Sequence, residues 1–515
     1  MKSYLLGLDV GTGGTRAVLV SKDGAIISSA TREHQPFASP HDGWAEQDPD
    51  DWWRAAAGAI RDCITKARLG GENVACIGLA GQMHGAVLLG DNNQVLRPAI
   101  IWCDQRTQEE CDWLDQTVGR ERLIQLTCNP ALTNFTLTKL LWVRNHEPRV
   151  WQGFRSFLLP KDYIRFRLTG EHATDMADAS GTLMLDVARR RWSSDIMARV
   201  GLPESCLPRV FESVEICARV SDDGARATGL RVGTPAIAGA GDQAGGAIGL
   251  GIVRPGDVSA TIGTSGVVFA ATDSPAMDPQ GRAHTFCHAV PDRWHVMGVT
   301  QAAGLSLRWF RDLLTGSPNY QKSYQELIAE AAATPAGANG LLWAPYLMGE
   351  RTPHLDARAR GALVGLSASH TRGHVVRAIL EGVGFSLKDT FALFDEMKVP
   401  VRSIRLGGGG ARSTLWRQIQ ADIYGQEVEI VYAEEGAAYG SALLAGVGRG
   451  VWSSVEEACE CAVHVATRVP PHPAAMDVMR RQYQIYRTLY PALKPVFARL
   501  TSNRSREMPN CPAGE

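Results

Sequence analysis

Two glycine-rich turns, each set between β-branched segments, constrain the fold of this chain more than any other feature. The first lies in LLGLDVGTGGTRAVLVSKDGAII, which spans residues 5–27. A Walker A turn needs a lysine after its glycines, and a Rossmann turn needs GxGxxG at the start of a helix. No lysine follows here, the segment after Gly14 is β-rich, and Asp23-Gly24 is a hairpin signal. We therefore expect strand, turn, strand, turn, strand.

The first turn has the chemistry of an anion site. Gly11 and Gly13 would let backbone N–H groups approach an anion closely, and Thr12 and Thr15 add hydroxyl donors. Asp9 would repel phosphate by itself, so it makes sense as a partner for Mg²⁺. Taken alone, this stretch fits an ordinary hairpin with an aspartate cap equally well.

A second copy of the turn favours phosphate binding. Residues 258–270 read VSATIGTSGVVFA, with Gly263, Thr264 and Ser265 between two β-branched segments about half a chain away. Two hairpin phosphate loops, one per domain, are typical of the actin-like ATPase superfamily. We therefore expect an α/β protein with two actin-like (ribonuclease H-like) domains hinged over a central cleft.

Composition narrows the class of protein. A length of 515 residues suits two domains, and 45% hydrophobic with 21% charged residues is ordinary for a globular chain. The net charge of −1 gives no electrostatic footprint for nucleic acid or an anionic membrane. No apolar stretch is long enough to span a bilayer, and Asp9 with its glycines interrupts any signal peptide. Eleven scattered cysteines fit reduced thiols, so we expect a cytoplasmic protein without membrane or nucleic-acid partners.

Two groups of residues raise the question of a transition metal. Cys459 and Cys461 form a lone CxC pair, and residues 284–295 contain three histidines and one cysteine. A structural zinc site needs four closely spaced ligands. We interpret both groups as packing and polar contacts, which leaves Asp9 as the one expected metal ligand.

Several motifs identify the chain as similar to the FGGY family of carbohydrate kinases, from Tyr4 to about Phe497. The resemblance is carried by the C-terminal signature at 361–381, an earlier signature at 134–146 around Lys139, and the segments 81–85, 161–163, 174–182, 284–288 and 349–353. Asn134 departs from the first position of the earlier signature. The resemblance implies ATP and Mg²⁺ as cofactors, a small sugar substrate and, as a family expectation, a homodimer.

The GQMHG loop at 81–85 most resembles the loop of kinases that act on D-xylulose. The resemblance therefore implies phosphorylation of D-xylulose at a terminal hydroxyl to D-xylulose 5-phosphate, which feeds pentose catabolism. The alternative is another ketopentose or polyol, such as ribulose or a tetritol. Cys103 and Gln243 stand where relatives carry asparagine, so the preferred ketose stays open.

Asp242 has two interpretations. Residues 234–243 read as a strand, a glycine-rich turn and a helix start, which puts Asp242 where a helix N-cap would stand. It could equally be the base that accepts the proton of an attacking hydroxyl. The resemblance implies the second role.

The sugar contacts are also implied by the resemblance. His84 sits in a turn between Gly81 and Gly85, where a lone histidine is more often structural. The resemblance favours sugar contact, with an apolar wall from Met83. It adds these further contacts: Gln243, Trp102 and Asp104.

Residues 406–412, LGGGGAR, read as a strand-to-helix turn followed by a helix at 415–423. A tight turn without a ligand is one interpretation. The resemblance implies adenosine binding here and on a nearby tryptophan, through Gly409, Gly410, Ala411, Thr414 and Trp309.

We expect a sugar-pocket domain at 1–253, a nucleotide domain at 254–500 and a loose tail at 501–515. An amphipathic helix at 476–500 could pack back on the first domain. Two other classes compete. An actin-like or chaperone-type ATPase would hydrolyse ATP without sugar and leaves 81–85 unexplained, whereas a sugar-sensing regulator would need an added DNA-binding segment.

Overall fold

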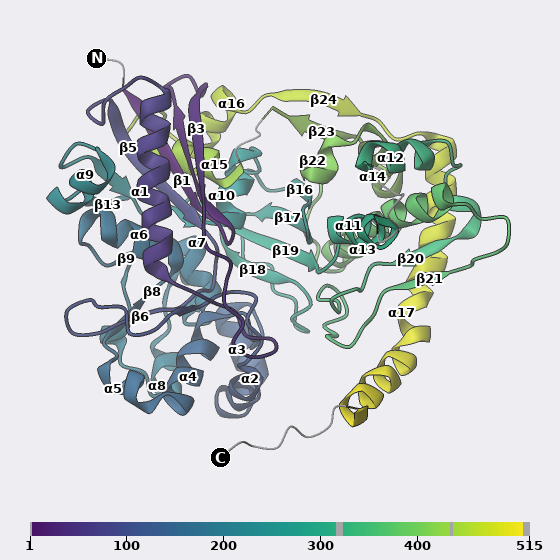
Figure 1. Ribbon diagram of the computed structural model, residues 1–515, viewed down its shortest axis with the longest axis horizontal. Coiled ribbons are helices and arrows are strands. Elements are labelled where there is room, and N and C mark those ends of the chain that lie inside the picture. Colours follow the sequence, from purple (N-terminus) through teal and green to yellow (C-terminus); the bar gives the residue numbers. More distant parts are fainter. Residues whose placement is uncertain (1–2, 316–322, 433–435, 508–515) are drawn as a thin grey trace. The chain divides into compact units, whose positions relative to one another are not determined.

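The computed structural model describes residues 3–315, 323–432 and 436–507. The chain divides into two compact units (Figure 1). Unit 1 comprises Met1–Pro255, Ala271–Val296 and Tyr432–His464, and unit 2 comprises Gly256–Ala270, Met297–Val431 and Val465–Glu515. The first break lies near the expected one, but two later segments return to unit 1. The expected division into two continuous domains, 1–253 and 254–500, stays a prediction.

The main sheet of unit 1 has the order β13-β14-β5-β1-β2-β3, with β15 also paired to β5. The first three strands pair antiparallel, which confirms the strand pattern predicted for residues 5–27. β5 is parallel to β1, and β14 and β15 are parallel to β5. The strands of this sheet are β1 (Tyr4–Val10), β2 (Gly14–Val20), β3 (Ile26–Glu33), β5 (Val74–Gly81), β13 (Ile216–Arg219), β14 (Pro235–Ile237) and β15 (Ala240–Gly241).

Both faces of this sheet are covered. Leu6, Leu8 and Val10 pack in one core with residues of α1, whereas Leu5 packs in a second core with residues of α15. This alternation along β1 is what a strand buried on both faces requires. The helices of unit 1 are α1 (Pro49–Lys66), α2 (Gln108–Leu114), α3 (Arg120–Thr127), α4 (Thr136–His146), α5 (Pro148–Gly153), α6 (Pro160–Thr169), α7 (Met176–Ala179), α8 (Ser194–Val200), α9 (Asp222–Thr228), α10 (Asp242–Gly249), α15 (Gly436–Gly448) and α16 (Val455–Ala462).

Unit 1 also holds short strand pairs and single turns outside the main sheet. The pairs are β4 (Glu46–Gln47) with β7 (Ala99–Ile100), β6 (Val87–Leu89) with β8 (Ser156–Leu158), β9 (Ala173–Asp175) with β12 (Arg209–Phe211), and β10 (Leu185–Asp186) with β11 (Arg191–Trp192). The remaining elements are β18 (His284–Cys287), the π-helix η1 (Asp115–Gly119) and the 3₁₀ turns η2 (Ser180–Thr182) and η3 (Glu204–Cys206).

Unit 2 repeats the strand plan. β16 pairs antiparallel with β17 and parallel with β22, as β1 does with β2 and β5. β22 is parallel to β23, and β24 closes the edge antiparallel to β23. The elements are β16 (Asp257–Ile262), β17 (Gly266–Thr272), β19 (Trp294–Thr300), β20 (Leu342–Ala344), β21 (Ala362–Val364), β22 (Ser403–Gly408), β23 (Val428–Val431), β24 (Val465–Val469), α11 (Gly304–Thr315), α12 (Tyr324–Ala332), α13 (Arg372–Glu396), α14 (Thr414–Tyr424), α17 (Pro473–Glu507), η4 (Ala338–Gly340) and η5 (Gly409–Arg412).

The terminal helix is longer than expected. α17 runs from Pro473 to Glu507, seven residues beyond the expected end at 500, so part of the expected tail is helical and 508–515 lie outside the described residues. The expected packing on the first domain stays a prediction, and the packing that the structure shows for α17 lies within unit 2. The tyrosines of α17 bond within unit 2, where Tyr483 donates to Asp389 at 2.7 Å and Tyr490 to Asp356 at 3.0 Å.

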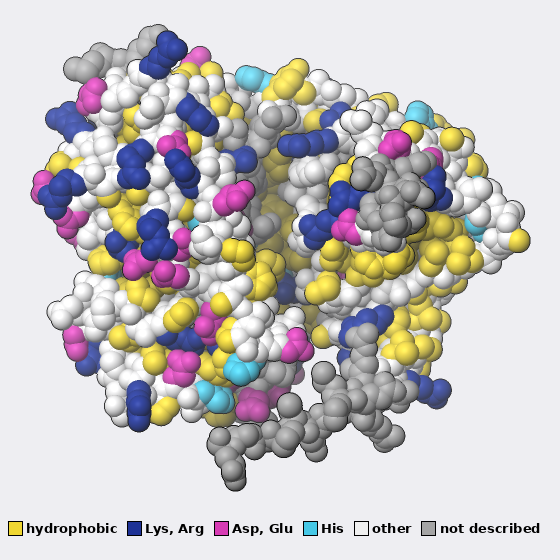
Figure 2. Space-filling model, in the orientation of Figure 1, with side chains coloured by type: hydrophobic (Ala, Val, Ile, Leu, Met, Phe, Trp, Pro, Cys, Tyr) yellow, Lys and Arg dark blue, Asp and Glu magenta, His cyan; other side chains and the backbone are white. Residues whose placement is uncertain are grey.

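Among the helices of the described ranges, we find none with the length and apolar character that crossing a bilayer requires. Figure 2 shows Lys and Arg side chains interspersed with Asp and Glu over the visible face of unit 1, at the left of the view.

Candidate active site

The turn between β1 and β2 brings together residues predicted for two ligands. The Thr12 hydroxyl accepts a hydrogen bond of 2.8 Å from the indole Nε1 of Trp102. One side chain predicted for ATP therefore touches one predicted for sugar. The hydroxyl of Thr15 is fully buried and lies 2.9 Å from His34 Nε2, so it supports the turn from the interior of unit 1.

Two predicted carboxylates, Asp9 and Asp242, lie at the ends of β1 and β15, which flank β5 on its two sides. Asp9 of β1 has Ala80 of β5 as its register partner. Ala80 is paired on its other side with Ala240 of β15, two residues before Asp242. The parallel strands β1, β5 and β15 thus end together and place both carboxylates at the same edge of the sheet.

Burial raises the pKa of both groups. The pKa of Asp242 rises to about 7 because the carboxyl is desolvated and because Asp9 is near. The pKa of Asp9 rises to about 6 by desolvation, against a lowering by Arg16. Asp9 Oδ1 is shielded from water and has no hydrogen-bond partner within the described part of the chain. Paired acids with raised pKa values are typical of sites that bind cations or move protons.

The structure rejects the capping role for Asp242. The N-cap of α10 is Gly241, no side chain caps the helix, and Asp242 is the first helical residue. Its Oδ1 atom accepts a 3.4 Å hydrogen bond from Gln243 Nε2. The carboxylate is therefore not used to begin the helix, and Gln243 lies beside it as expected.

Met83 and His84 follow the end of β5 and are both nearly buried. His84 Nδ1 lies 2.7 Å from the carbonyl oxygen of Gly181 in η2. A Cβ atom on Gly181 would come within 2.7 Å of His84 Cε1, and one on Gly241 within 2.8 Å of Met83 Cγ. Met83 therefore packs against the residue that precedes Asp242, so the predicted base and the 81–85 loop share one surface of unit 1.

The loop at 102–106 divides into an exposed and an internal part. The Trp102 side chain is 37% exposed. Asp104 is buried, accepts from the Ala45 N–H at 2.6 Å and forms an ion pair of 2.7 Å with Arg106. Both oxygens of Asp104 bond inside unit 1. Asp104 therefore shapes the loop, whereas Trp102 faces outward.

A buried charge cluster behind Gly241 was not among the predicted site residues. Lys161 is fully buried between Asp162 at 2.5 Å, Asp175 at 2.6 Å and Asp178 at 3.6 Å. Burial raises the pKa of Asp178 well above its usual range, and nearby acids, including Asp242, raise it further. The matching motifs at 161–163 and 174–182 were the sequence signal for this cluster. Its members come from separate elements, so their contact could not be inferred from spacing.

Unit 2 brings together the second turn and the 409–411 segment. The carbonyl of Gly263 accepts from the Gly304 N–H at 2.9 Å, which ties the turn to the start of α11. Gly408 of β22 pairs with Ile262 of β16. A Cβ atom on Gly410 would lie 2.6 Å from Ile262 Cβ, so this segment is in close contact with the end of β16.

The other unit 2 residues predicted for the nucleotide lie in the second turn, in α11, or in η5 and the start of α14. Thr264 and Ser265 lie in the turn, and the Thr264 carbonyl accepts from the Ala303 N–H at 3.0 Å. Ala411 is in η5, and Thr414 is the first residue of α14. Trp309 lies on α11 and stacks on Trp343 with a centroid separation of 5.5 Å. One face of the Trp309 ring is thus occupied, although the side chain is 39% exposed.

The histidines at 284–295 belong to an aromatic cluster. His284 stacks on Phe286 at 5.7 Å and contacts the amide of Asn129 at 2.9 Å. Phe135 packs edge-on against His84 at 4.9 Å. Among the described residues, no group of three or more His, Cys, Asp or Glu side chains is arranged to hold a metal ion.

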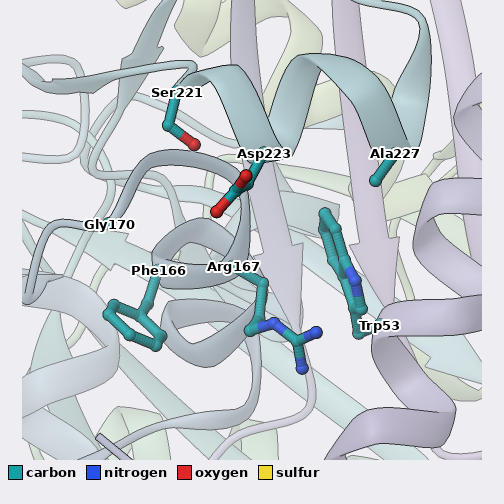
Figure 3. Close-up of a pocket in the computed structure, with 7 residues that line it drawn as sticks. All are labelled: Trp53, Phe166, Arg167, Gly170, Ser221, Asp223 and Ala227. Atoms are coloured by element: carbon teal, nitrogen blue, oxygen red, sulfur yellow. The ribbon is translucent and has the colours of Figure 1, made fainter. Parts of the chain in front are cut away.

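A separate pocket of about 390 Å³ lies on unit 1 (Figure 3). It is lined by residues of α1, α6 and α9 and the segments beside them, namely Trp53, Phe166, Arg167, Gly170, Ser221, Asp223 and Ala227. The guanidinium of Arg167 is paired with Asp50 and contacts the Tyr163 hydroxyl at 2.8 Å. None of the predicted site residues lines this pocket.

Comparison with known proteins decides the family. The N-terminal domain of the FGGY family of carbohydrate kinases matches residues 4–249, and its C-terminal domain matches 258–449. The chain belongs to the FGGY family of carbohydrate kinases. As a member of this family it is a carbohydrate kinase, and the family implies ATP as the phosphate donor.

The chain is similar to a xylulose kinase from Bacillus subtilis, with 38% identity over 97% of this chain and 99% of that protein. It is also 38% identical to a xylulose kinase from Escherichia coli, over 96% of this chain and 100% of the other. The crystal structure of a xylulose kinase from Rhodospirillum rubrum matches with a TM-score of 0.88 and 33% identity, covering 96% of this chain and all of that one. The two-domain FGGY kinase fold, with its actin-like (ribonuclease H-like) topology, is thereby established.

Proposed function

We propose that this protein transfers the γ-phosphate of ATP to a terminal hydroxyl of D-xylulose and forms D-xylulose 5-phosphate. The observation that carries the proposal is the pair Asp9 and Asp242 at one sheet edge, with Met83 of the sugar loop packed beside it. The relatives named xylulose kinase supply the choice of sugar, because they match nearly the whole chain.

Asp242 is the proposed general base. A pKa of about 7 leaves a substantial fraction ionised at neutral pH, and the proton is accepted more readily than by an ordinary aspartate. The carboxylate takes the proton of the sugar hydroxyl while that oxygen attacks the γ-phosphate in line. Phosphoryl transfer requires little covalent work from the protein, so holding the hydroxyl in place is the larger contribution.

The residues present fit a Mg²⁺ ion at Asp9. Its Oδ1 atom is a buried, unbonded carboxylate oxygen, and carboxylate oxygen is a preferred ligand of this ion. When bound, the ion would supply charge neutralisation for the phosphates. Asp9 would hold it, and the backbone groups and the Thr12 hydroxyl of the first turn would face the phosphate chain.

The proposed sugar contacts are Met83 as an apolar wall, with His84, Gln243 and Trp102 as polar neighbours. The proposed nucleotide contacts lie in unit 2, at the 263–265 turn and the 409–411 segment, whose close packing supports a shared ligand surface. Trp309, on the helix whose start bonds to the 263–265 turn, offers one ring face.

ADP release with Mg·ATP tests the function, measured without sugar and with D-xylulose, D-ribulose, L-ribulose, L-xylulose, glycerol or erythritol. We expect a strong and preferential rise with D-xylulose. A preference for another sugar would keep the kinase and assign the choice to Cys103 and Gln243. Hydrolysis that ignores every sugar would contradict the proposal and favour the ATPase alternative.

Cytoplasmic location and a homodimer belong to the same proposal. ATP as donor and the scattered cysteines of the sequence both suit a reducing compartment. Light scattering of the purified protein measures the oligomeric state directly.

A further inference from the structure

Helix α4 contributes a lysine, Lys139, that the proposed reaction does not use. The side chain is fully buried. Its ammonium donates to the carbonyl of His84 at 2.9 Å and to the carbonyl of Asn134. The bond to Asn134 uses its main chain and not its side chain.

A lysine in such a place is costly. Desolvation lowers the pKa of Lys139 to about 7, and its ammonium bonds to carbonyl dipoles rather than to a carboxylate. Buried charges of this kind are rare unless they do specific work. The contact that stands out is the carbonyl of His84, a proposed sugar contact.

His84 needs support because of its backbone. Its φ angle is +68°, in the left-handed region, which costs a side-chain-bearing residue roughly 1 kcal/mol. The Thr136 hydroxyl donates to the same carbonyl at 3.2 Å, so α4 grips this carbonyl twice. On the other side, the ring Nδ1 bonds to the Gly181 carbonyl, and since a carbonyl only accepts, Nδ1 carries the hydrogen.

Lys139 also interacts with the second loop predicted to contact the sugar, residues 102–106. Cys103 and Asp104 interact electrostatically with its ammonium and raise its pKa against the desolvation. Lys139 thus bonds to the 81–85 loop, and its charge interacts with residues of the 102–106 loop.

We propose that Lys139 is a positioning residue for sugar recognition, which holds the His84 carbonyl so that the imidazole stays bonded to Gly181 and faces the sugar in one orientation. This inference rests on the proposed function. The lysine contacts neither substrate, and its effect on the reaction passes through His84.

Lys139→Met tests the proposal because it keeps the length of the side chain and removes every donor. We expect the KM for the sugar to rise at least tenfold, while the KM for ATP and the sugar-free ATPase rate stay within twofold. Thr136→Val removes the second, longer bond and should raise the sugar KM about threefold. Lys388→Met is the matched control: Lys388 in unit 2 is half-buried and, like Lys139, donates to a backbone carbonyl, that of Ile423, and its loss should leave the sugar KM unchanged.

A sugar KM within twofold of wild type in folded Lys139→Met would overturn the proposal, and so would an equal rise in both KM values. If that variant does not fold, Thr136→Val decides by the same criterion. Crystal structures of the variants give a readout independent of activity. Loss of the left-handed φ at His84 supports the proposal, and an unmoved His84 contradicts it. If the wild type shows no dependence on sugar, the proposed function is refuted. The crystal structures of the variants would still test whether Lys139 holds the His84 carbonyl.

Discussion

The hairpins β1–β2 and β16–β17 have the same backbone plan but different chemistry. In the first, the second-last residue of the leading strand is Asp9, paired with Arg16. In the second, the corresponding residue is Thr261, paired with Val267. The second turn is also one residue shorter, because Val10 pairs with Thr15 but Ile262 pairs with Gly266.

The difference between the two hairpins shows which features belong to the shared backbone and which belong to the side chains of one unit. The hairpin itself supplies a glycine-rich turn between two strands, and both units have it. At the second-last position of the leading strand, the first hairpin has a buried carboxylate with a raised pKa and the second has a hydroxyl, and a second carboxylate, Asp242, follows β15, which is separated from β1 by β5. We infer that unit 1 handles the proton and the cation, whereas unit 2 holds the nucleotide by shape.

The substitution Asp242→Asn is the strongest test of the proton-transfer role assigned to unit 1. The amide keeps the shape but cannot accept the hydroxyl proton, so we expect turnover to fall by at least about 100-fold. The KM for the sugar should stay within a few-fold, because the side chain still fits its place. Steady-state kinetics with saturating Mg·ATP measure both, and near-normal turnover would remove Asp242 from its role.

The two hairpins are compared directly by Asp9→Asn and Thr261→Val. The first change removes the proposed cation ligand, and we expect turnover to fall on the order of 30-fold with a higher Mg²⁺ requirement. The second change removes only a hydroxyl at the corresponding position and should alter turnover less than about threefold. Equal losses in a Mg²⁺ titration would show that the hairpins are chemically equivalent.

The pH profile sharpens the assignment of the proton to unit 1. Asp242 must be ionised to act as a base, and its pKa is about 7. The kcat/KM for the sugar should therefore rise about tenfold between pH 6 and pH 8. The residual activity of Asp242→Asn should lack this rise, and a rise that persists there would assign it to another group.

The substitution Gly410→Ala tests the proposed nucleotide contacts in the 409–411 segment of unit 2. A Cβ atom there would lie 2.6 Å from Ile262 Cβ at the end of β16 and must shift one of the two segments. We expect the KM for ATP to rise about fivefold with no change in the KM for the sugar. Gly246→Ala, with nothing within 4 Å of its Cβ, is the control in unit 1. A selective rise in the sugar KM would reverse the assignment of the units.

The smallest expected effect concerns Thr15. Its hydroxyl bonds to buried His34, so Thr15→Val should lower the stability of the protein by about 1 kcal/mol without raising the KM for ATP more than twofold. Thermal unfolding and kinetics of the same sample separate the two outcomes. A large rise in the ATP KM with unchanged stability would restore the ATP contact expected from the sequence.

The sequence was sufficient where the signal was local. The strands around both turns and the helix after Gly241 follow from alternation and turn residues, which act over a few positions. The role of Asp242 could not be settled this way, because an N-cap and a first helical residue differ by one position and Gly241 takes the cap.

The features that could not be predicted from the sequence depend on packing between residues far apart in the chain. The charge cluster around Lys161 joins α6, β9 and α7, and no periodicity predicts which buried acids meet one lysine. The same limit applies to segments 271–296 and 432–464, which return to unit 1. α17 continues past 500 with two prolines inside it, Pro491 and Pro495, where composition alone predicts an end.

The contact between α10 and α15 sets a boundary for redesign. A Cβ atom on Gly440 would lie 1.9 Å from the Gly245 carbonyl, and one on Gly78 would lie 1.9 Å from the Ser441 carbonyl. The helix that carries Asp242 is thus seated main chain against main chain, with no adjustable side chain between. A library that seeks a new sugar preference can vary Met83 and Trp102, but it will recover glycine at positions 78 and 440 whatever sugar is selected.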